Sequence, residues 1–367
     1  MAILITIIVL ILAFIIALNI FIRQPKFGKM PEGERLQQIL SAANFKGGKF
    51  QNINHTPDLA EGVTYYKVMK EFFFEKSKNL RPFDVLPSKK TDLLKLDPTS
   101  NVMVWFGHSS YFLQVDGKKM LVDPVLSGAA SPVRFTTKSY KGSDVYKTDE
   151  IPEIDYLFLS HDHWDHMDYS TIMKLKPKIK KVICGLGVGA HLERWGFDKN
   201  ILIEKNWGEE ALLATGFKVT YTPARHFSGR GFKRQPTLWA SYVLQTPSLK
   251  IFIGGDSGYD THFTSIGDTY GPFDIAILEC GQYNANWKYI HMMPEETVQA
   301  AIDLKATKLV PVHWAKFSLG QHAWDDPIKR VTASAKEKGM PVCTPMIGET
   351  LNLDAPAIYK AWWMDVK

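Results

Sequence analysis

The nine residues SHDHWDHMD (160–168) carry three histidines and three aspartates, and they directly follow the apolar run IDYLFL (154–159). Alternate residues of an extended segment point the same way, so the imidazoles of His161 and His163 can reach one metal ion. Asp165 and His166 stand where the chain turns into a predicted helix (169–176) and can face a second ion. The alternative is a polar loop that is merely rich in histidine, and these nine residues alone do not exclude it.

Further imidazole and carboxylate side chains follow other apolar runs of the chain. They are Asp123 after KMLV (119–122), His226 after KVTYTPAR (218–225), Asp256 after KIFIGG (250–255) and His313 after KLVPV (308–312). The carboxyl ends of strands form the edge at which open α/β sheets place their sites. A single histidine at a strand end is more often a structural residue, but a set of this size favours a metal site. Imidazole and carboxylate suit zinc or iron, and Asp256 is placed to bridge two ions.

From about residue 99, short β-rich runs occur in groups with helical stretches between them. Strands are expected at 101–107, 154–160, 180–185, 217–226, 241–246, 249–256, 274–281 and 308–314, with a hairpin over 111–124 and helices at 169–176, 189–196 and 294–304. This order predicts a layered α/β domain. Its two halves resemble each other. Each has a hairpin-like set of strands, then a strand that ends in histidine or aspartate, and then a helix.

Residues 1–22 contain no charged side chain and, as a helix, would extend about 30 Å, the hydrocarbon thickness of a bilayer. We expect a retained single-pass anchor. A cleaved signal peptide is the alternative, but the apolar run exceeds the usual length of about 7–15 residues and no basic stretch precedes it. Basic residues flank only the carboxyl side of the run (Arg23, Lys26 and Lys29), which predicts that the large domain faces the cytoplasm.

Composition excludes some classes of protein. The 367 residues are 45% hydrophobic and 22% charged, with a net charge of +6, as in an ordinary globular protein. Dense basic runs are absent from the sequence, so we expect no nucleic-acid partner and disfavour a nuclease. Cys184, Cys280 and Cys343 are too few and too scattered for a disulfide framework. Residues 23–98 are expected to form a linker and packing extension that includes helices near 34–43 and 58–77, and residues 99–367 the main domain.

The chain resembles a known family, the metallo-β-lactamase fold, and within it the N-acylphosphatidylethanolamine-hydrolysing phospholipase D group. The matching stretches are WFGHSSYFLQVDGKKMLVDPVLSGAASP (105–132), LSHDHWDHMD (159–168), TPARHFSGR (222–230), GGDSGYD (254–260), GPFDIAILECG (271–281), HMMPEE (291–296) and VHWAKF (312–317). The resemblance implies a four-layer αββα sandwich, preceded here by the N-terminal transmembrane helix. It also implies two zinc ions, with iron or manganese as alternatives.

By position, the resemblance implies one zinc site at His161, His163 and His226, and a second at Asp165, His166 and His313. Asp256 would bridge the two ions and serve the reaction, and Asp123 would orient a ligand imidazole from behind. His108 and His291 match central positions that would contact substrate oxygens in a catalytic role, although a purely structural role explains each equally well. The aromatic residues beside the motifs are candidates for an acyl-chain groove, although each is equally well explained as core packing: Trp164, Phe227, Trp287, Tyr289 and Trp314.

Some positions depart from the mammalian members of the group. Phe227 stands where they usually have tryptophan, and Met293 where they have aspartate. The loop YNANWKY (283–289) lacks an acidic residue, and the N-terminal anchor is not a feature of the mammalian form. These differences leave metal binding intact and put the preference for acyl chain and headgroup in doubt.

The expected activity is zinc-dependent phosphodiester hydrolysis of N-acylphosphatidylethanolamine-type membrane phospholipids. A hydroxide shared by two ions about 3.5–4 Å apart would attack phosphorus. The alternatives are a metallohydrolase of a lactone or another phosphodiester, and a non-catalytic membrane-tethered scaffold. Degeneration into a scaffold normally removes ligands, whereas here all seven are present. The sequence leaves the oligomeric state open, a dimer included.

Overall fold

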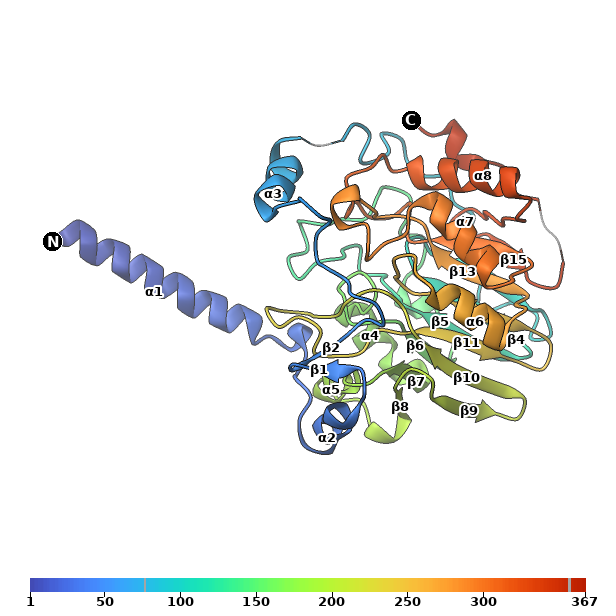
Figure 1. Ribbon diagram of the computed structural model, residues 1–367, viewed down its shortest axis with the longest axis horizontal. Coiled ribbons are helices and arrows are strands. Elements are labelled where there is room, and N and C mark those ends of the chain that lie inside the picture. Colours follow the sequence, from blue (N-terminus) through green and yellow to red (C-terminus); the bar gives the residue numbers. More distant parts are fainter. Residues whose placement is uncertain (76, 356–357) are drawn as a thin grey trace.

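Two β-sheets lie face to face and carry helices on their outer faces (Figure 1). The structure is a computed structural model that describes residues 1–75, 77–355 and 358–367. The expected four-layer αββα sandwich is confirmed. It places the carboxyl ends of strands from both sheets at one edge, where the histidine and aspartate motifs lie.

The first sheet has seven strands in the order β15-β3-β4-β5-β6-β7-β8. These strands are β3 (Val102–Trp105), β4 (Tyr111–Val115), β5 (Lys118–Val122), β6 (Ile154–Leu159), β7 (Ile179–Gly185), β8 (Leu202–Lys205) and β15 (Thr350–Asn352). From β15 to β5 neighbouring strands are antiparallel, and from β5 to β8 they are parallel.

The second sheet has six strands in the order β14-β13-β12-β11-β10-β9. They are β9 (Glu210–Ala214), β10 (Phe217–Thr222), β11 (Ser241–Gln245), β12 (Lys250–Ile253), β13 (Ile275–Glu279) and β14 (Leu309–Val312). The strands β9 to β12 pair antiparallel, and β12 to β14 pair parallel. Each sheet therefore combines an antiparallel ladder with parallel strands, which matches the similarity between the two halves of the sequence.

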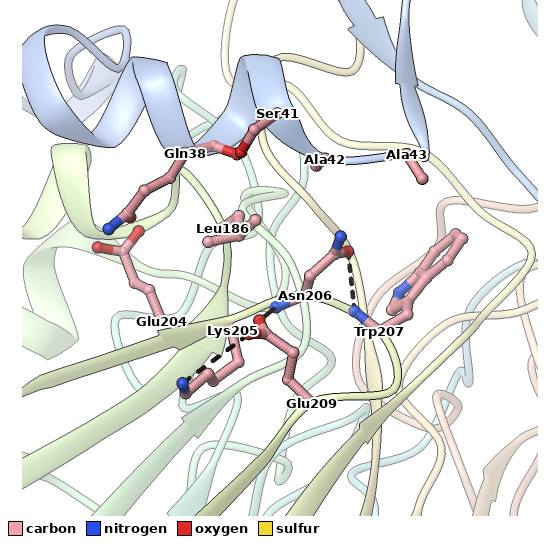
Figure 2. A pocket seen from close by; sticks show the side chains of 10 residues that line it. All are labelled: Gln38, Ser41, Ala42, Ala43, Leu186, Glu204, Lys205, Asn206, Trp207 and Glu209. Carbon is pink, nitrogen blue, oxygen red and sulfur yellow. Dashed lines mark hydrogen bonds and ion pairs between the residues drawn. The ribbon is translucent and has the colours of Figure 1, made fainter.

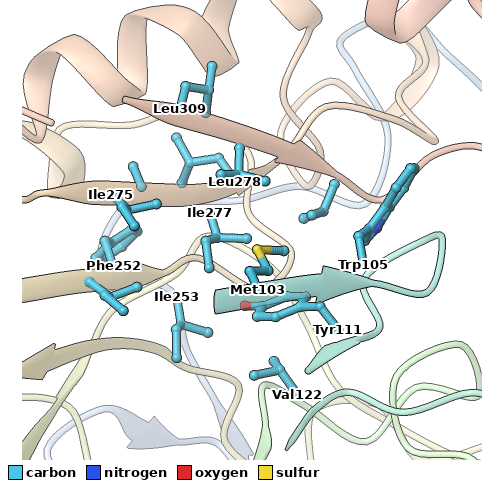
Figure 3. Close-up of a cluster of buried hydrophobic side chains, with 14 of the residues drawn as sticks. Met103, Trp105, Tyr111, Val122, Phe252, Ile253, Ile275, Ile277, Leu278 and Leu309 are labelled. Carbon is cyan, nitrogen blue, oxygen red and sulfur yellow. The ribbon is translucent and has the colours of Figure 1, made fainter. Parts of the chain in front are cut away.

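Alternation along the strands explains why both faces of each sheet are covered. In β3, Met103 and Trp105 point into the core between the sheets, whereas Val104 points to the opposite face. Figure 3 shows this inter-sheet core, in which Met103 lies close to Ile277 of β13. Because successive side chains point to opposite faces, strands buried on both sides are apolar almost throughout.

The outer layers are helical. On the seven-stranded sheet lie α4 (Tyr169–Leu175) and α5 (Gly189–Arg194), and on the six-stranded sheet lie α6 (His262–Tyr270), α7 (Pro294–Asp303) and α8 (Asp326–Lys338). Short 3-10 turns occur at Pro25–Phe27, Thr148–Glu150, Lys176–Lys178, Lys199–Ile201, Ala285–Trp287 and Trp362–Asp365. The helices expected at 169–176, 189–196 and 294–304 correspond to α4, α5 and α7.

The segment before the sandwich forms α2 (Gly33–Ser41), the hairpin β1 (Phe45–Lys46) and β2 (Lys49–Phe50), and α3 (Tyr65–Phe74). Ile39 and Phe50 are buried against Leu238 and Trp239 of the sandwich. The helix expected over 58–77 is shorter than predicted, and its position 76 lies outside the described residues. Residues 77–98 form mainly turns and bends, and Ser88 makes an isolated β-bridge with Ile347.

The N-terminal helix α1 (Ala2–Ile22) projects away from the sandwich (Figure 1). Its mean hydropathy reaches 3.2, and its 21 residues are long and apolar enough to cross a membrane. A signal sequence meets the same criteria of length and composition.

The inter-sheet core yields a stability prediction. Ile277→Ala should lower the free energy of unfolding by about 2–5 kcal/mol, because Ile277 is 1% exposed and truncation leaves a cavity. Urea unfolding of the detergent-solubilised protein measures the loss. The matched control is Leu212→Ala on β9, which is 76% exposed and should change stability by no more than about 0.5 kcal/mol. Equal losses in the two variants would contradict this account of the core.

Candidate metal centre

Three histidines form the first donor set, and they come from two different loops. His161 and His163 follow β6, and His226 follows β10. The Nδ1 atom of His163 lies 2.8 Å from Nε2 of His161 and 3.3 Å from Nε2 of His226. Three ring nitrogens therefore converge on one point, which is the arrangement that an imidazole-bound metal ion requires.

A second donor set lies beside the first and is connected to it through Asp256. Nε2 of His166 lies 3.4 Å from Oδ2 of Asp165, and Nδ1 of His313 lies 3.1 Å from Oδ1 of Asp256. Oδ2 of Asp256 lies 3.0 Å from Nε2 of His166, and 3.9 and 3.8 Å from Nε2 of His161 and His226. Asp256 thus contacts both sets, as the expected bridging residue should.

The buried state of these groups fits bound metal. Nε2 of His166 and Nε2 of His313 are buried and lack a hydrogen-bond partner among the described residues. Burial lowers the pKa of His163 to about 4 and holds the pKa of His161 well below its usual value. Neutral imidazole is the form that binds metal, so His161 and His163 are held ready for it. Against the opposing effect of burial, the carboxylates of Asp256, Asp165 and Asp123 instead raise the pKa of His166 well above its usual value, so a bound metal ion would have to displace a proton there. The residues present therefore fit a pair of metal ions.

We call residues 160–168 the metal loop. Asp123 and Ser160 fix the orientation of this loop from the side opposite the metal positions. Oδ2 of Asp123 lies 2.9 Å from Nδ1 of His166, and its Oδ1 accepts from the backbone N–H of Ser160. The hydroxyl of Ser160 in turn lies 2.9 Å from Nδ1 of His161. Such contacts hold each ring so that its other nitrogen faces the metal. That Asp123 orients a ligand imidazole stays a prediction, and its contact with Nδ1 of His166 is compatible with it.

His291 and Glu279 lie on another side of the cluster. The ring of His291 is 5.0 Å from the His226 ring and 5.3 Å from the His313 ring, between centroids. Its Nδ1 is 3.0 Å from Oε2 of Glu279, and burial raises the pKa of Glu279 well above its usual value. The sequence interpretation did not single out Glu279. The signal that could have found it is the same as for the other ligands, since Glu279 is the last residue of the apolar strand β13.

His108 lies beneath the cluster rather than at its open side. It is fully buried, its Nε2 is 2.8 Å from Oδ2 of Asp165, and its ring is 4.0 Å from the His313 ring. His163 and His291, in contrast, are half-buried and lead to the surface. The structure thus gives His108 the part of holding Asp165, instead of the direct substrate contact expected from the resemblance.

The structure also gives places to Asp162 and Asp168, for which the sequence offered no role. Asp168 accepts from the N–H groups of Ser170 and Thr171 and so caps α4. Asp162 accepts from the N–H of Gly229 and from the hydroxyl of Thr237, and lies 3.1 Å from Nε2 of His191. Neither carboxylate is among the residues that converge on the metal positions.

The metal loop is fastened to the segment that follows α1, which we call the exit segment (25–29). Arg230 donates to the carbonyls of Asp162 and Met167 in the loop, and to the carbonyl of Lys26. The N–H of Lys29 donates to Nδ1 of His191, which connects the exit segment to Asp162. Gly28 has φ +75, and a Cβ there would lie 1.9 Å from His191, so this close approach requires glycine.

The candidate groove residues fall into two groups. Four are half-buried near the cluster: Trp164, which contacts Phe27 and Arg230; Phe227, which contacts His163; Trp287; and Tyr289, which contacts Arg225. The expectation for Trp314 is corrected. Its side chain is 1% exposed, its ring stacks on Trp105 and Trp362, and it belongs to the core.

A cavity of about 390 Å³ lies away from the metal motifs, between α2 and the β8 end of the first sheet (Figure 2). Its polar groups already have partners. Glu204 pairs with Arg35, and Asn206 exchanges side-chain hydrogen bonds with Asn44. The cavity therefore lies at the contact between the N-terminal segment and the sandwich.

The contacts of Asp123 generate a prediction about metal affinity. Asp123→Asn should weaken metal binding by about 10–100-fold, because the amide cannot hold the His166 ring as the carboxylate does. Competition titration against a chelator measures the affinity. Asp149→Asn, which alters a carboxylate in the 3-10 turn Thr148–Glu150, is the control and should leave the affinity unchanged. Unaltered affinity in Asp123→Asn would show that the ring is held by other contacts.

Comparisons with known proteins agree with the fold. The family described as "Beta-lactamase superfamily domain" matches residues 118–314. An uncharacterised protein of Mycobacterium tuberculosis is 34% identical over 324 residues, which is 87% of each chain. A Caenorhabditis elegans protein named N-acyl-phosphatidylethanolamine-hydrolyzing phospholipase D 1 is 28% identical over 64% of this chain and 73% of that one. The structure of Igni18, a metallo hydrolase from Ignicoccus hospitalis, has a TM-score of 0.51 at 21% identity, covering 69% of this chain and 98% of that one, and supports the fold. The chain belongs to the β-lactamase superfamily and has the metallo-β-lactamase fold.

Proposed function

We propose that the chain is a metal-dependent phosphodiesterase that hydrolyses N-acylphosphatidylethanolamine-type phospholipids in the manner of a phospholipase D. One observation carries the proposal: two sets of buried donors meet at the carboxylate of Asp256. A pair of bound divalent ions would lower the pKa of water to about 7 and neutralise charge on a phosphoryl oxygen. The oxygen of water would become bonded to phosphorus, and the bond to the N-acylethanolamine oxygen would break.

Two features support a lipid substrate. The Caenorhabditis elegans relative, which is 28% identical over 64% of this chain, is named for hydrolysis of this lipid. The apolar helix α1 would hold the domain at a bilayer, and its exit segment contacts the metal loop. We therefore propose that α1 is a retained anchor. That the large domain faces the cytoplasm remains a prediction from the flanking basic residues.

The ligand chemistry supports zinc. His161, His163 and His226 would hold one ion, and Asp165, His166 and His313 the second, with Asp256 between them. Imidazole nitrogen and carboxylate oxygen together suit zinc, and iron and manganese accept the same donors.

His291 is the residue best placed to contact a substrate oxygen. Burial keeps the pKa of His291 below its usual value, so the ring is neutral. With Glu279 protonated, its Oε2 donates to Nδ1 of His291, and the ring proton resides on Nε2. Nε2 then donates to a phosphoryl oxygen as negative charge develops there.

Hydrolysis of a lactone or of another phosphodiester is the second candidate, because the same donor sets would serve it. The purified full-length protein, loaded with zinc, should release phosphatidic acid from N-acylphosphatidylethanolamine in mixed micelles. It should leave an acyl-homoserine lactone intact. Removal of metal by a chelator should abolish the activity, and zinc should restore it. Turnover of the lactone without turnover of the lipid would contradict the phospholipase proposal and favour lactone hydrolysis.

Variants of the cluster test the assignment of ligands. Asp256→Ala and His313→Ala should each abolish hydrolysis and lower the bound metal, because each removes a donor from the second set. Metal content by mass spectrometry and lipid turnover are the measurements. His55→Ala changes an exposed histidine and should preserve both. Full metal content with no turnover of any ester would revive the non-catalytic scaffold.

Glu279 offers a test of the proposed protonation, in which Glu279 carries a proton and the ring proton of His291 resides on Nε2. Glu279→Gln keeps a donor toward Nδ1 of His291 and an acceptor for the N–H of Ser257, so it should retain most of kcat. Glu279→Leu removes both contacts and should lower kcat by about 10²-fold. If Glu279→Gln loses as much as Glu279→Leu while both keep their metal, a carboxylate is required and the arrangement is wrong.

A further inference from the structure

The helix α3 exposes an unusual number of aromatic side chains. Tyr65, Tyr66, Met69, Phe72, Phe73 and Phe74 are all exposed, the last of them at 82%. They belong to a helix of ten residues. Soluble proteins rarely expose large contiguous apolar patches, and such a patch usually marks an interaction site.

The helix has two distinct faces. Val68 and Glu71, one turn apart, are its half-buried residues and face the body of the protein. Tyr66, Met69 and Phe73 are spaced i, i+3 and i+7, so they share one stripe on the opposite face. The apolar stripe therefore points away from the sandwich, where none of the described residues covers it.

Contacts fasten α3 to the rim of the metal centre. The hydroxyl of Tyr65 donates to Asp58, and Asp58 pairs with Arg234 at 2.8 Å. The guanidinium of Arg234 lies 3.7 Å above the ring of Phe227, which contacts the ligand His163. On its inner face, Glu71 accepts from the side chain of Asn286, in the turn that precedes His291.

The loop that contains Arg234 also lies between α3 and the end of α1. Phe232, two residues before Arg234, is 81% exposed and lines a cavity of about 230 Å³ together with Ile22 and Phe27. Figure 1 shows α1 and α3 extending from the same side of the sandwich. Three apolar features, namely α1, Phe232 and α3, thus border the surface that leads to the metal ligands.

We propose that α3 lies in the interfacial layer of a phospholipid bilayer and that, with α1, it turns the mouth of the metal centre toward the lipid. Tyrosine and phenylalanine on the apolar face of an amphipathic helix suit this layer, which accepts apolar bodies with polar edges. The proposal concerns membrane contact and holds whatever bond the metal centre hydrolyses.

The charges of α3 specify the kind of lipid contact. Lys70 lies 2.6 Å from Glu75, and Lys67 lies 3.8 Å from Glu71, so acidic partners offset both lysines. Attraction to anionic headgroups is therefore weak. Insertion depends on burial of the aromatic stripe and proceeds on zwitterionic phosphatidylcholine.

Spin labels on the full-length protein in phosphatidylcholine vesicles test the proposal. A label at Phe73→Cys, and a second at Met69→Cys on the same stripe, should collide several-fold more with oxygen, which concentrates in lipid, than with a water-soluble nickel chelate. Both positions are exposed, so neither substitution removes core packing. The native cysteines Cys184, Cys280 and Cys343 are buried and do not compete for the label.

The matched control is a label at Leu212→Cys, on β9, which should prefer the nickel chelate. The preference at 69 and 73 should persist in about 1 M salt, where the Debye length is about 3 Å. Nickel accessibility equal to that at 212 would overturn the proposal, as would loss of the oxygen preference in salt. Shielding from both reagents with spin–spin broadening would also overturn it, since a second copy of the chain would then cover α3.

Discussion

The carboxylate of Asp256 is the constraint on which the rest of the centre depends. It is 4% exposed, and it stands within 3.0–3.9 Å of histidines that come from β6, β10 and β14. Burial raises the pKa of Asp256 to about 6, so the negative charge is costly unless positive charge accompanies it. Bound metal ions would supply that charge. The apolar packing between the two sheets brings the donors that would hold them within reach of one another.

The way the sandwich is built brings these residues together. The parallel strands β5 and β6 of one sheet, and β12, β13 and β14 of the other, end at the same edge of the molecule. Each ends in a polar residue after a buried apolar run, which explains why a list of strand ends located the metal ligands. The same rule, applied to β13, would have found Glu279. What strand ends cannot show is which polar residue faces the metal and which stands behind it, because that depends on side-chain direction across the two sheets.

The sequence was less informative about aromatic residues and about residues 23–98. Trp314 and Trp164 both adjoin metal motifs, yet one stacks in the core and the other lies half-buried beside Phe27. Local sequence cannot separate these cases, because contacts with residues far along the chain decide them: Trp105 for Trp314 and Phe27 for Trp164. Likewise, the sequence offered no role for Asp162, whose place depends on His191 and, through it, on the exit segment. Helix α6 contains glycine and threonine, which are poor helix formers, and tertiary packing stabilises it.

The fastening of the exit segment to the metal loop bears on how a water-soluble form of the protein could be made. Cutting the chain immediately after Ile22 would remove the apolar helix and keep the carbonyl of Lys26 for Arg230 and the N–H of Lys29 for His191. Cutting a few residues later, within the linker-like stretch that looks dispensable, would leave Arg230 with fewer partners and release Trp164 on one side. The first cut removes only the apolar helix, whereas the second also removes contacts that support the metal loop.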